Sequence, residues 1–300
     1  MISNIEYKYF IPQQKILFYL KKDKTYQETH SLIKRLYKQT IRKPSNLLIN
    51  IIQPLLWLIM FGALFQNAPI YLFEKYKLEY REFLNAGIII FTAFNSSINA
   101  GITIVFDREF GFLNRILISP ITNKSSLIYS CIIHTWFITI IQIAGIILIT
   151  CYQNQKNNNY LQSISNLNNI IITATITTIV IITISNLSIF NGLILPGHIE
   201  FIGITTFFLN LPTLFTSTAL APLSFMPHWL QIIACINPLT YAIEIIRNLH
   251  LNQLSKLNEI IISTELIRAN AIQGILILLS TNIISFILVR NIIKYKYDKT

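Results

Sequence analysis

Six long stretches of this chain carry almost no charge, and each is long enough to cross a lipid bilayer. A helix rises about 1.5 Å per residue and the hydrocarbon core is about 30 Å thick, so roughly 20 apolar residues suffice. Backbone groups in lipid must be hydrogen-bonded within their own segment, which predicts a helix for each stretch. The approximate spans are 47–66, 83–106, 125–152, 170–196, 201–226 and 270–289. Pro212 and Pro222 predict that the outer end of the fifth span is broken.

Composition supports a single membrane domain. The chain has 300 residues, of which 53% are hydrophobic and only 12% are charged. A soluble protein carries about 25% charged residues to cover its surface. We therefore expect a polar N-terminal segment (1–46), a six-span domain (47–289) and a basic tail (290–300).

The basic residues predict the orientation. Residues 1–46, 107–124 and 290–300 together hold 17 of the 24 Lys and Arg residues. With six spans these segments lie on one face, which the positive-inside rule assigns to the cytoplasm or stroma. The net charge of +11 then reflects orientation and attraction to lipid headgroups. We expect no nucleic-acid partner, because the basic residues flank spans instead of forming a separate basic domain.

An amphipathic helix is predicted before the first span. Its apolar positions recur at helical spacing and are Ile33, Leu36, Tyr37 and Ile41. Its basic positions are Lys34, Arg35, Lys38, Arg42 and Lys43. This pattern is typical of a helix lying in the headgroup plane and ending near Pro44. A solvated basic arm is the alternative.

The loop after the second predicted span contains a second short amphipathic segment. Phe112, Leu113, Ile116 and Leu117 form an apolar face at helical spacing within residues 107–120. Such a helix suits docking into a groove on a partner protein. A simple interfacial connector explains the spacing equally well.

The region before the last span predicts a re-entrant helical pair. The apolar run Leu230–Ile236 is too short to cross the membrane and is followed by Pro238. Trp229 and Tyr241 suit the membrane–water boundary. Glu244 and Arg247 are three positions apart and could pair on one helical turn.

These motifs resemble those of type-2 ABC exporter permeases over about residues 30–290. The matching positions in the last region are Pro227, Trp229, Asn237, Pro238, Tyr241 and Arg247. The loop at 107–120 is similar to the family's coupling helix, with matching positions Glu109, Gly111, Leu113 and Arg115. The chain departs from the family pattern at 197–200 and 215–218, which weakens any substrate inference.

The resemblance implies an all-α permease subunit of an ATP-driven exporter. A second permease copy, most simply a homodimer, would bind two cytoplasmic ATPase subunits, and ATP and Mg²⁺ would sit on those ATPases. The coupling residues would be Glu109, Gly111, Leu113 and Arg115. Family members export varied cargo, so the substrate stays open.

The residues themselves predict no catalytic or cofactor site on this chain. It has no GxxxxGK[ST], HExxH or GxSxG motif and no CxxC pair. An integral-membrane lipid-modifying transferase would need a His and acid cluster at a boundary, but the acid-rich loop 74–82 lacks histidine. A non-transport membrane assembly factor stays open.

Polar residues inside the spans are candidate contacts. His134 suits a helix–helix hydrogen bond, with a proton or substrate contact as the alternative. The candidate pathway residues are Asn95, Asn99, Asn186, Asn191 and Asn210.

Codon-linked composition indicates the source. The chain contains 62 isoleucines and 26 asparagines, both encoded by A/T-rich codons. We therefore expect a plastid membrane protein, with a bacterial inner membrane as the alternative.

Overall fold

The computed structural model describes residues 14–42, 44–65, 80–118, 125–153, 166–194, 210–250, 259–264 and 268–297. Nearly all of this is helical. The helices are α1 (Gln14–Arg42), α2 (Pro44–Leu64), α3 (Tyr80–Glu109), α4 (Phe112–Ile118), α5 (Ser126–Gln153), α7 (Leu167–Ile194), α9 (His228–Ile236), α10 (Pro238–His250) and α11 (Ala271–Tyr297). Two short strands, β1 (Ile260–Ser263) and β2 (Arg268–Asn270), precede α11.

Four helices in the described ranges are long and apolar enough to cross a membrane. They cover Glu82–Glu109, Ser126–Cys151, Leu167–Ile194 and Ala271–Ile293. A fifth span results if α9 and α10, which meet at 89°, are taken together. The apolar part of α2, Leu48–Leu64, is shorter. Four of the six predicted spans are thus confirmed as apolar helices of sufficient length.

The predicted fifth span, 201–226, is only partly within the described residues. Residues 201–209 lie outside them, and residues 210–215 form a short helix that contains Pro212. Beyond Phe215 the chain turns, and the 3₁₀ turn Leu223–Phe225 follows Pro222. The break predicted at the outer end of this span is therefore confirmed, since the helix ends at Phe215, three residues after Pro212.

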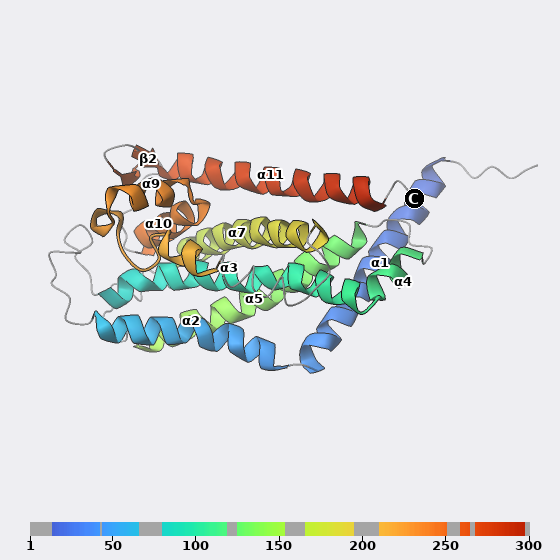
Figure 1. Ribbon diagram of the computed structural model, residues 1–300, viewed down its shortest axis with the longest axis horizontal. Coiled ribbons are helices and arrows are strands. Elements are labelled where there is room, and N and C mark those ends of the chain that lie inside the picture. Colours follow the sequence, from blue (N-terminus) through green and yellow to red (C-terminus); the bar gives the residue numbers. More distant parts are fainter. Residues whose placement is uncertain are drawn as a thin grey trace, which may run out of the picture.

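The long helices run roughly along one axis, with short elements at both ends (Figure 1). Helix α3 lies at the centre and packs against α2, α5, α7 and α10. At one end, α1 crosses the bundle beside α4 and near the end of α11. At the other end lie α9, α10 and the β hairpin. The two ends of the bundle are therefore built from different elements.

Burial distinguishes α3 from the other spans. The α3 side chains from Phe83 to Ala93 are almost all buried, whereas α11 exposes large apolar side chains along its length. Those exposed α11 side chains are Ile272, Leu276, Leu279, Ile283, Ile284, Phe286 and Ile287. Such apolar surface is compatible with lipid tails, so α11 is a peripheral helix and α3 an internal one.

Helices α3 and α7 approach closely because small residues line their crossing. A Cβ on Gly101 would overlap the Ser188 carbonyl oxygen, and a Cβ on Gly192 would lie 2.9 Å from the Gly101 carbonyl oxygen. The Ser188 hydroxyl donates to the Ile98 carbonyl at 2.6 Å. Small residues at such crossings let membrane helices gain packing and hydrogen bonds.

The β hairpin was not anticipated by the all-α prediction, which is wrong at this point. Strands β1 and β2 pair antiparallel, with Ile262 opposite Ala269 and Ser263 opposite Arg268. Ile261, Ile262 and Ala269 are buried in the core beside α10. Three consecutive β-branched isoleucines at 260–262 favour the strand.

Candidate functional site

The turn between α3 and α4 is built around Gly111. The Phe110 amide donates to the Phe106 carbonyl at 3.0 Å, and the Gly111 amide donates to the Arg108 carbonyl at 3.2 Å. Gly111 has φ of 69°, in the left-handed region that favours glycine. The Arg115 amide then donates to the Gly111 carbonyl at 3.3 Å and begins α4. Gly111 thus turns the chain out of the bundle axis.

The inner face of α4 is covered by the chain itself. Leu113 is only 2% exposed and belongs to a buried cluster at this end of the bundle. The other members are Leu36, Ala100, Ile104, Leu127, Ile128, Cys131, Ile189, Leu193, Val289 and Ile293. The prediction that Leu113 contacts a partner is therefore wrong for this structure, because its apolar face is already occupied.

The outer face of α4 is exposed. We call Glu109, Phe110, Asn114 and Arg115 the α4 ridge, since all four side chains lie on the surface. Phe110 is 73% exposed, and its ring stacks against Phe106 with centroids 6.1 Å apart. The ridge therefore combines an acid, an exposed aromatic ring, an amide and a base over seven residues.

Arg35 joins α1 to both helices of this turn. Its guanidinium makes two hydrogen bonds to the buried Asp107 carboxylate at the end of α3, one of them 3.0 Å from Nη1 to Oδ1. The same guanidinium stacks 3.9 Å from the centroid of the Phe112 ring, at the start of α4. Forked pairing and stacking on a ring are both specific to arginine. We call this contact the Arg35 clamp.

The sequence prediction placed Arg35 among the basic positions facing headgroups, and so missed the clamp. The available signal was Asp107, an acid directly after an uncharged span, which needs a cation when buried. Neighbouring Arg108 also turns inward, donating to the Gly192 and Leu193 carbonyls at 3.3 and 3.5 Å. There it satisfies carbonyls near the C-terminal end of α7.

His134 forms the predicted helix–helix hydrogen bond. Its Nε2 lies 2.9 Å from the Thr40 hydroxyl, which joins α5 to α1. The Tyr37 ring packs edge-on against His134 with centroids 5.0 Å apart. Burial raises the pKa of the Tyr37 phenol, because loss of water penalises the phenolate. The apolar face predicted for α1 therefore packs partly on protein.

The family-motif residues build the bend at the opposite end of the bundle. Asn237 separates α9 from α10, and its side-chain oxygen accepts from the Leu239 amide at 3.0 Å. Pro238 is the first residue of α10, where its missing N–H costs nothing. The Tyr241 hydroxyl donates to the Cys235 carbonyl at 2.8 Å and satisfies the end of α9.

The remaining motif positions before the bend lie at the surface. Pro227 precedes α9 in an extended conformation, with φ of −62° and ψ of 154°. Trp229 is 63% exposed, as expected for an interfacial anchor.

Arg247 is the buried centre of the motif region. It donates from Nη1 to Glu244 at 2.5 Å, from Nη2 to the Thr218 carbonyl at 2.6 Å and from Nε to the Phe83 carbonyl at 3.3 Å. Its guanidinium also lies 3.6 Å from the Phe83 ring centroid. The predicted Glu244–Arg247 pair is confirmed, and it holds α10, α3 and the turn after Phe215 together.

Four of the candidate asparagines lie at three separate places in the structure. Asn210 donates to Asn95 at 2.9 Å, and Asn95 donates to Gln53 at 3.1 Å, so this set links three helical segments. Asn186 is fully buried beside Ser285 on α11, and Asn191 is exposed. Among the described residues, no group of three His, Cys, Asp or Glu side chains could hold a metal ion.

The apolar spans, the projecting α4 and the bent α9–α10 pair define a multi-pass membrane protein. The chain belongs to the ABC-2 type transporter family, whose match covers residues 27–251.

Curated relatives support the same assignment. The chain is similar to "Putative transport permease ycf38" of Porphyra purpurea, 42% identical over 272 residues that cover 91% of this chain and 90% of the relative. The protein of that name from Cyanophora paradoxa is 40% identical over 268 residues, which cover 89% of each chain. These relatives come from plastid genomes of algae, which agrees with the prediction that this chain is a plastid-encoded member of the family. The chain is thus a multi-pass membrane protein that is homologous to transport permeases.

Proposed function

We propose that this chain is the membrane subunit of an ATP-driven exporter, and that a separate ATPase docks on the α4 ridge. ATP and Mg²⁺ would bind the ATPase, and this chain would form the substrate pathway with a second copy of itself. The observation that carries the proposal is the division of α4 into a buried face and an exposed ridge.

The contacts beneath the ridge support a coupling role. Leu113 anchors α4 in a cluster shared by α1, α3, α5, α7 and α11. The Arg35 clamp ties the same turn to α1. A displacement of the ridge by a partner would therefore reach five helices, because close-packed interiors transmit strain instead of absorbing it. Within the ridge, Glu109 and Arg115 would orient the partner while Phe110 provides apolar contact.

The proposed architecture has six spans. Besides the four long apolar helices, α2 and a broken segment within 201–226 would complete the domain at 47–289. The α1 region of residues 1–46 would lie at the headgroup level, and α9–α10 would form a re-entrant pair. Both termini and the tail at 290–300 would face the stroma or cytoplasm of a plastid membrane, on the α4 side.

Cysteine labelling tests this orientation at two exposed phenylalanines. Phe110 lies on the α4 ridge, and Phe225, 62% exposed, lies at the α9 end. A membrane-impermeant maleimide should label Phe110→Cys only from the stromal or cytoplasmic side and Phe225→Cys only from the other. Labelling of the parent chain gives the background from its three native cysteines. The reverse pattern would reject the proposed orientation.

The docking proposal is tested by placing a charge on the ridge. Phe110→Asp should reduce recovery of the ATPase subunit, and of the ATP hydrolysis that co-purifies with the tagged chain, by at least about tenfold. A charge in a desolvated contact costs more than 1.4 kcal/mol, which corresponds to tenfold in affinity. Phe225→Asp is the matched control, because it makes the same change at an equally accessible phenylalanine at the other end. Equal ATPase recovery with both variants would remove the α4 ridge from the interface.

A further inference from the structure

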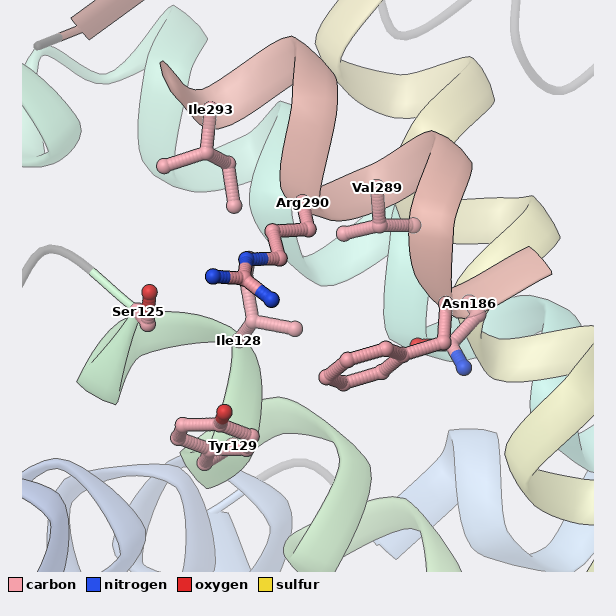
Figure 2. Close-up of a pocket in the computed structure, with 8 residues that line it drawn as sticks. Ser125, Ile128, Tyr129, Asn186, Val289, Arg290 and Ile293 are labelled. Carbon is pink, nitrogen blue, oxygen red and sulfur yellow. The ribbon is translucent and has the colours of Figure 1, made fainter. Parts of the chain in front are cut away.

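A pocket of about 380 Å³ lies between α5, α7 and α11, at the same end of the bundle as α4 (Figure 2). It is lined by Ser125, Ile128, Tyr129, Asn186, Phe286, Val289, Arg290 and Ile293. Its volume falls in the range of small-molecule sites, about 300–1,000 Å³. Helix α7 packs on both α5 and α11, whereas the described parts of α5 and α11 share no comparable contact, which leaves room between them.

Arg290 supplies a cation to this pocket. Figure 2 shows its guanidinium extending from α11 toward Ser125 and Ile128 on α5, with the Tyr129 ring on the same side. No acidic side chain in the described ranges pairs with it. The pocket therefore offers an uncompensated guanidinium, which favours an anionic group such as a phosphate.

Asn186 supplies an unsatisfied polar atom on the inner wall. The residue is fully buried, and its Nδ2 lies 3.5 Å from the Ser285 hydroxyl. That hydroxyl already donates to the Asn282 carbonyl at 2.7 Å, and the Asn186 Oδ1 has no partner among the described residues. This oxygen is closed to solvent in the structure, and a buried acceptor left unpaired is costly, so rotation of the Asn186 amide toward a ligand hydroxyl would be favoured.

The surroundings of the pocket favour a membrane lipid over a soluble ligand. The apolar span of α5 begins at Ser126 and that of α11 ends at Ile293, so the pocket lies where both helices reach the headgroup region. Tyr129, Ile133 and Phe137 on α5 are exposed, as are Ile283, Phe286 and Ile287 on α11. These stripes give acyl chains a surface on either side of the opening.

We propose that this pocket binds the headgroup of an anionic lipid that carries hydroxyl groups, such as phosphatidylglycerol. Arg290 would pair with the phosphate. The Asn186 oxygen, turned toward the pocket, would accept from a glycerol hydroxyl, and Tyr129 would offer a second hydrogen bond at the rim. None of the lining residues belongs to the α4 ridge, although Ile128, Val289 and Ile293 lie in the cluster that packs on Leu113.

The test is native mass spectrometry of the full-length chain titrated with single lipids. Arg290→Gln should weaken phosphatidylglycerol binding at least tenfold, equal to about 1.4 kcal/mol. Arg42→Gln removes the same charge from an exposed position at the end of α1, outside the pocket, and should change binding less than twofold. Phosphatidylcholine binding should be weak and the same for all three proteins.

Two further ligands separate the possible sources of the anion. Phosphatidic acid keeps the phosphate but lacks the glycerol hydroxyls, and should bind more weakly than phosphatidylglycerol. Free glycerol phosphate should not displace the lipid at lipid-equivalent concentrations. Unchanged phosphatidylglycerol binding by Arg290→Gln would overturn the proposal. Displacement by glycerol phosphate would overturn the lipid assignment, and equal binding of phosphatidic acid would overturn the hydroxyl contact.

Discussion

Arg247→Leu should sharply reduce the yield and thermal stability of the folded protein. The substitution leaves the buried Glu244 carboxylate without its cation and removes donors from the Phe83 and Thr218 carbonyls. Removing one partner of a buried ion pair typically costs about 3–5 kcal/mol. That is a large part of a total stability of roughly 5–15 kcal/mol. Size-exclusion chromatography after a temperature series in detergent measures the loss.

Two control variants identify the cause. Arg268→Leu makes the same change at the exposed first residue of strand β2 and should leave the melting temperature within a few degrees of the parent. Adding Glu244→Gln to Arg247→Leu removes the carboxylate charge as well and should recover part of the loss. If Arg247→Leu melts like the parent, the buried ion pair does not stabilise this end of the bundle.

Leu113→Asp should destabilise the fold itself, in addition to any effect on partners. The side chain is 2% exposed and touches a cluster drawn from five helices, so the new carboxylate would be shut off from water among apolar side chains. Burial of an unpaired charge costs several kcal/mol even after relaxation. The same melting assay should show a marked fall in melting temperature and more aggregation.

Asn114→Asp is the matched control for Leu113→Asp. It adds the same negative charge one residue later, on the exposed side of α4. It should leave the melting temperature close to that of the parent. A different result would be that Leu113→Asp melts like the parent and loses only its ATPase. Leu113 would then face the partner during transport, and its packing in the cluster would not be needed for stability.

Hydropathy predicted α3, α5, α7 and α11 because lipid requires long uncharged helices. It could not distinguish the internal α3 from the peripheral α11. Lipid tails and protein neighbours are both apolar, so Phe83 on α3 and Ile283 on α11 give the same signal although only Phe83 is buried. The β hairpin depends on tertiary contacts and was missed for that reason, whereas Pro212 and Pro222 predicted the break near Phe215.

In the candidate site, contacts between residues close in sequence were predictable, and contacts between residues far apart in sequence were not. Glu244 and Arg247 are three residues apart, so their pairing was predictable from helical spacing. The Phe83 and Thr218 carbonyls are 164 and 29 residues away, and nothing in the spacing indicates them. The predicted partner contact of Leu113 shows the same limit. The amphipathic pattern correctly places Leu113 on an apolar face, but it cannot say whether Leu36 or a partner covers that face.

The glycine-lined crossing of α3 and α7 limits how this protein can change shape. With backbone against backbone at Gly101, Gly192 and Ser188, the two helices cannot slide without steric overlap, and interlocked packing admits discrete rearrangements instead of gradual ones. We therefore expect α3 and α7 to move together as one rigid body. Any opening and closing of a pathway would then come from the outer helices moving relative to the rigid α3–α7 pair.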